Sequence, residues 1–250
     1  MSYYKTLEEF KSSTGHEIDG FWYPRVTSIL SIKSKPALYR FYAKQDSFEA
    51  GEAIKNKSAE EGTLLHDTVE AILRGQSPAL PEIIRPAINS FLEFKQQHEI
   101  IPHKIEEKLI STKHRYSGTL DCLAEINGHL GVLDIKTSKA IYRDYNLQTA
   151  AYIEALRENE TMPPLKRWIL RLDQSSRCLT CGSTMRQKGG SESIQLARFG
   201  SLAKTCNHVW GETSGNLEFK ELYGVEKDIQ AFLAAKTLWE WENDYWLRQI

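Results

Sequence analysis

The sequence predicts an α/β fold with a mixed central sheet flanked by helices. Two amphipathic helical segments come first, three strand-like segments follow, and another helix precedes two further strand-like segments. The helical segments repeat their apolar positions every three to four residues, whereas the strand-like segments alternate or are continuously apolar. Helices placed before and between strands in this order are typical of a sheet that is covered by helices.

The N-terminal part of the chain predicts short elements. Residues 16–23 are rich in aromatic side chains and predict a short strand or hairpin. Thr27 or Ser28 is placed to cap a short helix. Pro36 suits the first turn of a further helix, which we expect to run through Tyr42.

Longer helices are predicted at four places. In residues 50–74, Leu65, Val69 and Ile72 fall on one helical stripe, and Gly75 marks the end of the segment. The other helices are expected at residues 83–98, 145–158 and 225–250.

Five segments predict strands, and the first three are consecutive. Asn127-Gly128 separates the second strand from the third, and this dipeptide is a strong signal for a two-residue hairpin turn. The predicted strands cover residues 104–112, 119–126, 130–137, 168–172 and 217–223.

A polar stretch, residues 174–214, separates the last two strands and predicts an insertion into a main domain formed by residues 1–173 and 215–250. The insertion is rich in Ser, Gly, Thr and Cys. Such a stretch buries too little apolar surface to become ordered without a cross-link such as a bound metal ion.

Metal-binding side chains within the insertion could supply that cross-link. Three thiolates and one imidazole form a closed tetrahedral set for zinc, and Gly182 permits a tight turn around the ion. The alternative is a group of reduced, exposed thiols. The candidate zinc ligands are Cys178, Cys181, Cys206 and His208.

Charge is distributed unevenly along the chain. The net charge of the 250 residues is -1, which excludes a globally basic nucleic-acid binder. Residues 166–204 nevertheless hold eight basic and two acidic side chains, so the net charge of this segment is +6 and that of the remaining residues is -7. The segment is either an exposed basic loop or a surface that contacts DNA phosphates in a salt-dependent way. The candidate DNA-binding residues there are Arg177, Arg186, Lys188, Arg198 and Lys204.

Two carboxylates and one ammonium group are expected to meet in the sheet. The hairpin at Asn127-Gly128 brings the strand of Asp121 beside the strand of Asp134, and strand alternation puts Asp134 and Lys136 on one face. Clustered carboxylates repel each other unless a cation lies between them, and Mg²⁺ and Mn²⁺ prefer such oxygen ligands. A lysine beside this metal is suited to phosphodiester hydrolysis. An isolated Asp-x-Lys ion pair at a strand end is the simpler alternative.

Four motifs in one order make the hydrolytic interpretation more specific. They are Gly-x-x-x-His-x-x-x-Glu, then Gly-x-x-Asp, then Asp-x-Lys, then Gln-x-x-x-Tyr. Their order resembles the PD-(D/E)XK nuclease superfamily, and in particular its RecB-like exonuclease branch. Leu120 stands where the superfamily name has proline. The matching residues are Gly62, His66, Glu70, Gly118, Asp121, Asp134, Ile135, Lys136, Gln148 and Tyr152, and residues 26–30 look like the family's N-terminal segment.

The resemblance implies a restriction-endonuclease-like fold and a role for each matched residue. The catalytic lysine would be Lys136, and Gln148 and Tyr152 would position the DNA or the lysine. A further acid from the preceding strand, Glu106 or Glu107, would complete the site, and we expect Glu107. The implied ligands of Mg²⁺ or Mn²⁺ are His66, Asp121, Asp134 and the backbone carbonyl of Ile135.

The resemblance also bears on the cysteines. Some RecB-like nucleases hold an iron–sulfur cluster with one cysteine before the nuclease core and three after it. This chain has no cysteine before Cys122, so zinc is expected rather than an iron–sulfur cluster.

We therefore expect a Mg²⁺- or Mn²⁺-dependent deoxyribonuclease, and more specifically an exonuclease of DNA repair, recombination or phage DNA processing. The alternatives are a catalytically silent DNA- or protein-binding module on the same fold, and an endonuclease. The expected partners are DNA and a helicase or a recombination or replication protein. No apolar run is long enough for a membrane span, and residues 1–10 lack the apolar core of a signal peptide, so a cytoplasmic location is expected.

Overall fold

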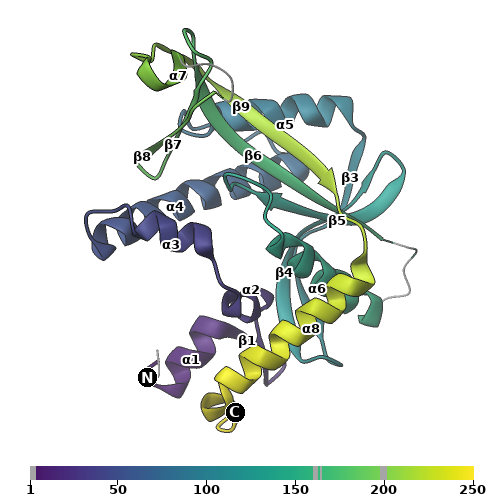
Figure 1. Cartoon of the computed structure of the whole chain (residues 1–250). Helices are drawn as coiled ribbons and strands as arrows, with labels where there is room; N and C mark the ends of the chain where they lie inside the picture. Colours follow the sequence, from purple (N-terminus) through teal and green to yellow (C-terminus); the bar gives the residue numbers. More distant parts are fainter. Residues whose placement is uncertain (1–3, 160–162, 164, 198–201) are drawn as a thin grey trace.

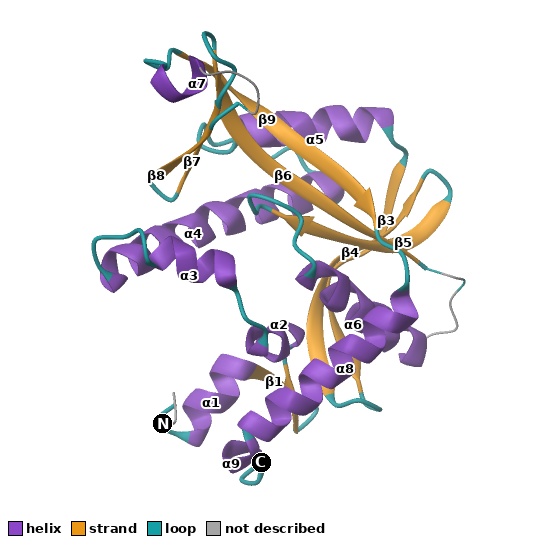
Figure 2. Ribbon diagram, in the orientation of Figure 1, coloured by secondary structure: helices purple, strands orange, loops and turns teal. Residues whose placement is uncertain are grey.

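The computed structural model describes residues 4–159, 163, 165–197 and 202–250 and shows a central mixed sheet with helices on both faces (Figures 1 and 2). The predicted α/β class is confirmed. In the described part of the chain, no helix is long and apolar enough to cross a membrane. The helices are α1 (Leu7–Thr14), α2 (Val26–Ile29), α3 (Pro36–Tyr42), α4 (Phe48–Leu73), α5 (Arg85–Gln97), α6 (Asp144–Asn159), α7 (Leu202–Thr205), α8 (Val225–Glu242) and α9 (Asp244–Leu247), with a 3-10 turn at Leu30–Ile32. The strands are β1 (Gly15–Ile18), β2 (Phe21–Pro24), β3 (Ile100–Ser111), β4 (Tyr116–Ile126), β5 (His129–Lys136), β6 (Lys166–Cys178), β7 (Thr184–Lys188), β8 (Ser191–Gln195) and β9 (Trp210–Glu221).

The main sheet has the order β3-β4-β5-β6, and β9 pairs with the other edge of β6. The pair β5–β6 is parallel and its two strands are joined through α6, whereas the other pairs of this sheet are antiparallel. The turn between β4 and β5 has positive φ at both Asn127 (49°) and Gly128 (78°), as a type I′ hairpin requires. This turn sets the register that brings the ends of β4 and β5 together.

Two apolar cores lie on opposite faces of the sheet. One core joins the sheet to α1, α2, α6 and α8, and Phe10, Tyr152 and Trp239 are among its buried members. The other core lies under α4 and α5 and includes Val69 and Phe91. Helix α4 therefore covers one face of the sheet while α6 covers the other.

The last two strands of the sheet are longer than the sequence predicts. Strand β6 continues to Cys178 and β9 begins at Trp210, and the two pair along most of their length. The predicted insertion at residues 174–214 therefore begins and ends inside continuous strands. Its middle contains the β7–β8 hairpin, which pairs with the end of β6. The predicted helix over 225–250 divides at Asn243 into α8 and α9.

Candidate active site

Asp121 and Asp134 lie on neighbouring antiparallel strands. Because Cys122 pairs with Leu133, the two carboxylates fall next to each other where β4 meets β5. The Asp121 carboxylate accepts a hydrogen bond of 2.6 Å from the backbone N–H of Ile135, which fixes its direction. The hairpin thus brings the two acids together as the sequence predicts.

A histidine and a third acid complete the cluster. His66 comes from α4, Glu106 from β3 and Asp121 from β4, and their ligand atoms lie within 4.8 Å of one another. Glu106 has a positive φ of 53°, an unusual backbone conformation for a non-glycine residue. Three elements that are distant in the sequence therefore converge on one small volume.

The expectation of Glu107 at this position is wrong: the structure places Glu106 there. Glu107 pairs with Leu120, one residue away from the position opposite Asp121, and its side chain is half exposed and 4.0 Å from Lys104. Strand alternation sends Glu106 and Glu107 to opposite faces of the sheet, so a shift of one residue exchanges their roles.

Lys136 forms a buried ion pair with Asp134. The Nζ atom of Lys136 is 2.7 Å from Oδ2 of Asp134, whose side chain has no exposed surface. Burial acts to lower the pKa of Lys136, but the charges of Asp134 and Asp121 outweigh it and raise this pKa, so the ammonium group stays charged. The ammonium group also lies 5.1 Å from the ring centre of Tyr145.

Burial disfavours the charged form of the acids in the cluster and raises their pKa values. Burial, together with the neighbouring charge of Asp121, raises the pKa of Glu106 to about 7. Burial is also the main reason why the pKa of Asp134 rises to about 6, although Lys136 acts to lower it. Burial likewise raises the pKa of Asp121. A divalent cation between these oxygens would relieve the repulsion.

The donor set fits a divalent metal ion. Oδ1 of Asp134 is buried without a hydrogen-bond partner among the described residues, a condition that a ligated cation would satisfy, while Oδ2 pairs with Lys136. Burial and the Lys136 charge lower the pKa of His66, which favours the neutral imidazole that binds metals. His66 also interacts with the backbone of Ile135, whose carbonyl is the other predicted ligand.

Comparison with known proteins agrees with this geometry. A family model of the PD-(D/E)XK nuclease superfamily matches residues 37–221, which is most of the chain and includes every residue of the cluster. The chain belongs to the PD-(D/E)XK nuclease superfamily. The central mixed sheet with flanking helices is consistent with the superfamily's fold, and membership implies a metal-dependent nuclease that hydrolyses phosphodiester bonds. A search of curated proteins finds no match.

Gln148 and Tyr152 lie on the side of the PD-(D/E)XK cluster formed by α6. The amide N–H of Gln148 donates to the Tyr152 hydroxyl oxygen at 2.9 Å. Burial raises the pKa of Tyr152 well above its usual range, and the charges of Asp134 and Asp121 add to this shift, so the phenol stays protonated. Gly118 makes room for the ring, because a Cβ atom there would lie 2.5 Å from it.

This contact predicts a large effect for a small substitution. Gly118→Ala is expected to destabilise the protein by about 1–3 kcal/mol, because the added methyl group overpacks a buried ring. Urea unfolding of the variant measures the loss. The double variant Gly118→Ala/Tyr152→Leu should lose less than the sum of the two single variants. Strict additivity would show that the methyl group and the ring do not compete.

Glu70 has a local partner. Its carboxylate pairs with Arg74 at 2.8 Å, and Arg74 also donates to the carbonyl of Ile105 at 3.0 Å. The pair ties α4 to β3 directly beside Glu106. In this structure Glu70 therefore supports the cluster from outside, and its oxygen atoms are not among the grouped ligand atoms of His66, Glu106 and Asp121.

The β7–β8 hairpin contacts the end of β5. Arg186 and Lys188 donate to the carbonyl of Thr137, at 3.1 and 2.7 Å, and Thr137 directly follows Lys136. On the other side, Gly62 of α4 leaves room for Thr137, whose hydroxyl would lie 2.9 Å from a Cβ atom at that position. The end of β5 is thus held between a helix and the hairpin.

Sequence reasoning missed Tyr145 and the contacts of the hairpin. Tyr145 lies one helical turn before Gln148 and two before Tyr152, so helical periodicity alone could have placed it on the same face. Arg186 and Lys188 are 49 and 51 residues away from Thr137 in the sequence, so their contacts join distant segments. No local pattern in the sequence encodes such contacts.

The predicted zinc ligands come together at the far end of β6. The ligand atoms of Cys178, Cys181, Cys206 and His208 all lie within 4.8 Å of one another. Sγ of Cys178 is 3.8 Å from Sγ of Cys206, and Sγ of Cys181 is 3.3 Å from Nδ1 of His208. Tetrahedral zinc with Zn–S bonds of about 2.3 Å separates its sulfur atoms by about 3.8 Å. The donor set therefore fits a zinc ion.

The backbone around these cysteines forms a tight turn. The N–H of Gly182 donates to the Cys178 carbonyl at 3.0 Å, and the N–H of Cys178 donates to the Ser183 carbonyl at 2.7 Å. Gly182 has a φ of 74°, which confirms the expected need for glycine there. Burial acts to raise the pKa of Cys178, but hydrogen bonds from the Cys181 backbone and the His208 side chain outweigh it and lower the value to about 5.

The predicted DNA-binding residues are distributed over different surroundings. Arg177 and Lys204 are exposed, whereas Arg186 and Lys188 are partly buried against Thr137. Arg186 also pairs with Asp173 at 2.7 Å. Arg198 lies outside the described residues. The predicted surface is therefore not one continuous patch of free cations.

Proposed function

We propose that the chain is a Mg²⁺- or Mn²⁺-dependent deoxyribonuclease that acts as an exonuclease. The observation that carries this proposal is the convergence of His66, Glu106 and Asp121 beside the Asp134–Lys136 pair. Membership of the superfamily supplies the reaction class, and the buried Oδ1 of Asp134, which has no hydrogen-bond partner among the described residues, supports a bound cation.

Each residue of the site has its own proposed role in phosphodiester hydrolysis. The metal would be held by His66, Glu106, Asp121, Asp134 and the Ile135 carbonyl. When bound, Mg²⁺ or Mn²⁺ lowers the pKa of water and polarises phosphoryl oxygens. Lys136 offsets the negative charge that builds on phosphorus in the transition state, and its ammonium group is kept charged and oriented by Asp134. Gln148 and Tyr152 fix the α6 side of the site.

The RecB-like assignment rests on the histidine of α4 and the Gln-Tyr pair of α6. These residues face the site together with the Asp-x-Lys pair, as the resemblance to RecB-like exonucleases implies. A role in DNA repair, recombination or phage DNA processing, with a helicase or a recombination or replication protein as partner, follows from that assignment. A cytoplasmic location is part of the same proposal.

We further propose that Cys178, Cys181, Cys206 and His208 hold a structural zinc ion. The ligand separations support this assignment, and a tetrahedral four-ligand set leaves no open position for catalysis. The ion would fix the end of β6, the start of β9 and the base of the β7–β8 hairpin in one place.

The proposed activity is tested by digestion of end-labelled linear single- and double-stranded DNA with Mg²⁺, Mn²⁺ or EDTA, beside a circular control. An exonuclease shortens the linear strands progressively in the presence of metal and leaves the circle intact. Cutting of the circle would instead indicate an endonuclease. Retained DNA binding without hydrolysis under any of these conditions would indicate the catalytically silent binding module.

Adjacent glutamates offer a matched test of the metal site. Glu106→Gln is expected to weaken the apparent affinity for Mn²⁺ by tenfold or more, since even outer-shell partners of a metal are worth about 10- to 100-fold. Glu107→Gln removes the same charge from the other face of β3 and should leave the affinity unchanged. Titration of activity against Mn²⁺ measures both, and the reverse result would restore Glu107 to the site.

A further inference from the structure

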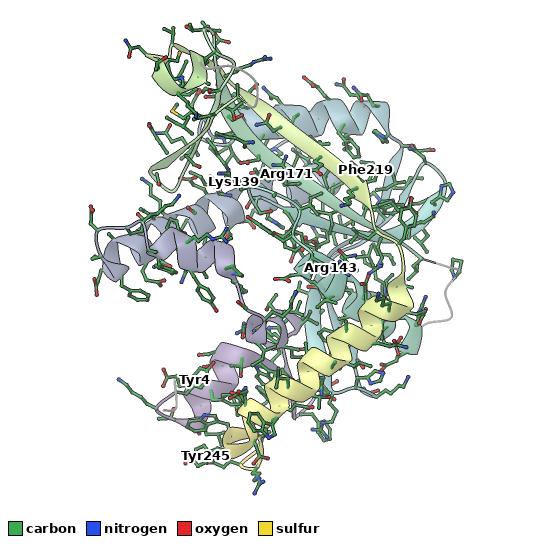
Figure 3. All side chains as sticks on the ribbon, in the orientation of Figure 1. Tyr4, Lys139, Arg143, Arg171, Phe219 and Tyr245 are labelled. Atoms are coloured by element: carbon green, nitrogen blue, oxygen red, sulfur yellow. The ribbon has the colours of Figure 1, made fainter. Side chains whose placement is uncertain are left out.

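A large groove adjoins the candidate active site. Its volume is about 1020 Å³, and its walls are α3 with the start of α4, the segment between β5 and α6, and the β7–β8 hairpin. Lys139 and Arg143 belong to the segment between β5 and α6, and Figure 3 labels both near the centre of the molecule. The groove therefore lies where three separate parts of the chain meet.

The lining of the groove is strongly basic. Eight lysine and arginine side chains line it, against two carboxylates. One of these carboxylates, Asp144, already pairs with Lys33. The excess of positive charge favours a polyanionic ligand.

Four of these cations are exposed and have no carboxylate partner among the described residues: Lys35, Arg40, Lys44 and Arg143. Exposed cations without such a partner also occur elsewhere on the described surface, but these four line one groove. Three of the four flank or belong to α3, whose sequence contains no acidic residue.

Helix α3 packs on α4 through Tyr42, whose ring stacks on that of Phe48 with ring centres 5.2 Å apart. It is seven residues long and contains no buried residue. An aromatic side chain of the helix accompanies its cations, because Phe41 lines the groove. On the opposite wall, Tyr142 lines the groove and is 40% exposed.

The groove leads to the catalytic lysine. Tyr142 packs edge-on against Tyr145, with ring centres 5.9 Å apart, and the Tyr145 ring lies next to Lys136. From the hairpin side, Lys188 lines the groove and contacts Thr137, the residue after Lys136. A strand lying in the groove would thus reach the site from the α3 side.

The hairpin wall of the groove is fixed in place. The N–H of Gly189 donates to Glu61 of α4 at 3.0 Å, and Lys139 donates to Ser193 of β8 at 2.9 Å. A Cβ atom at Gly189 would lie 2.5 Å from the carbonyl of Ile54, so the hairpin lies directly against α4.

We propose that this groove binds a single strand of DNA and guides it to Lys136; the identity of the ligand as DNA rests on the proposed function. The unpaired cations contact phosphates, and Phe41 and Tyr142 stack on bases. Stacking requires bases that are not paired in a duplex, and a basic groove with aromatic side chains is the common arrangement for single strands. The specific choice of a single strand follows from the presence of both kinds of side chain on facing walls.

The test measures binding separately from cleavage. Fluorescence anisotropy of the full-length chain in EDTA uses a labelled oligothymidylate of about 20 nucleotides, longer than the roughly 4–16 nucleotides that one single-strand-binding fold covers. A duplex of the same length and an abasic single strand are the comparison ligands. Hydrolysis by the wild type with Mn²⁺ is measured in parallel.

The groove variant is Arg40→Ala/Lys44→Ala/Arg143→Ala. We expect it to bind the single strand at least about tenfold more weakly and to reduce the salt slope by about 2, since each phosphate contact on a single strand contributes about 0.7. The control variant, Lys108→Ala/Lys220→Ala/Lys227→Ala, removes three exposed positive charges from β3, β9 and α8 and should bind like the wild type.

The aromatic part has its own readout. Phe41→Ala and Tyr142→Ala should each weaken binding of oligothymidylate by about tenfold and leave binding of the abasic strand unchanged. Equal losses for both ligands would mean that the rings do not stack on bases, which contradicts the single-strand assignment. Tighter binding of the duplex than of the single strand by the wild type would contradict it as well.

The outcomes separate this proposal from the proposed function. If the wild type hydrolyses DNA and the groove variant binds like the control, the groove proposal is wrong and the nuclease assignment stands. If the wild type binds single strands through the groove but never hydrolyses them, the nuclease assignment fails and the groove proposal stands.

Discussion

Lys136→Met is expected to reduce phosphodiester hydrolysis by about a thousandfold or more. The substitution keeps the length of the side chain but removes the ammonium group that offsets transition-state charge, and electrostatic groups of this kind are worth about 10²–10³ each, while proton-transfer groups are worth about 10²–10⁴. Single-turnover hydrolysis of a labelled strand at saturating Mn²⁺ measures the loss. Activity close to that of the wild type would remove Lys136 from the mechanism.

The same substitution has a second consequence, because Lys136 is the ion-pair partner of a fully buried Asp134. Loss of one member of a buried pair leaves an uncompensated charge and typically costs about 3–5 kcal/mol. Urea unfolding in EDTA should therefore show a less stable variant, and Mn²⁺ should restore stability by occupying the site.

A double variant separates the two effects of Lys136. Asp134→Asn/Lys136→Met removes both charges, so most of the stability should return while activity stays absent. Lys108→Met, which changes an exposed lysine of β3, is the matched control and should alter neither property. If the double variant is no more stable than Lys136→Met, the buried pair is not the cause of the loss.

The sequence contained enough information to predict the centre of the site. Asn127-Gly128 has the two positive φ angles of a type I′ turn, and that turn fixes the register between Asp121 and Asp134. Alternation then places Lys136 with Asp134 on one face. The hairpin register and the strand alternation both depend on residues close together in the sequence, so both could be inferred without the structure.

The choice between Glu106 and Glu107 needed more than local pattern. The register between β3 and β4 is irregular between Pro102 and Lys104, and Glu106 has a positive φ. Each irregularity breaks the simple alternation on which a sequence argument depends. In the structure, the pairing of Leu109 with Gly118 sets the register and brings Glu106 beside Asp121.

Polar strands were hard to predict for a related reason. The C-terminal part of β6 and the N-terminal part of β9 consist largely of polar residues and glycine, so they lack the apolar alternation of a strand. They are strands because they pair with each other over residues 168–178 and 210–221, which is a tertiary contact. The groove beside α3 is also tertiary, since its walls come from three distant segments.

Loss of the cysteine cluster is expected to have the other large effect. Cys178→Ser should abolish binding of one zinc ion per chain, because structural zinc sites require their full set of thiolate and imidazole ligands. Structural zinc contributes about 10–16 kcal/mol of apparent binding energy in small zinc domains, so its loss should unfold the surrounding segment locally. Elemental analysis measures the metal, and limited proteolysis reports opening between β6 and β9.

Hydrolysis should fall in the same variant, although the cluster lies at the far end of β6. The β7–β8 hairpin starts six residues after Cys178, and its Arg186 and Lys188 hold the Thr137 carbonyl beside Lys136. Cys122→Ala is the control: Cys122 is buried in the sheet and is not one of the grouped ligands, so the variant should keep its zinc. Bound iron with visible absorbance would identify an iron–sulfur cluster instead, and an unchanged proteolysis pattern in zinc-free protein would show that the metal does not order the segment.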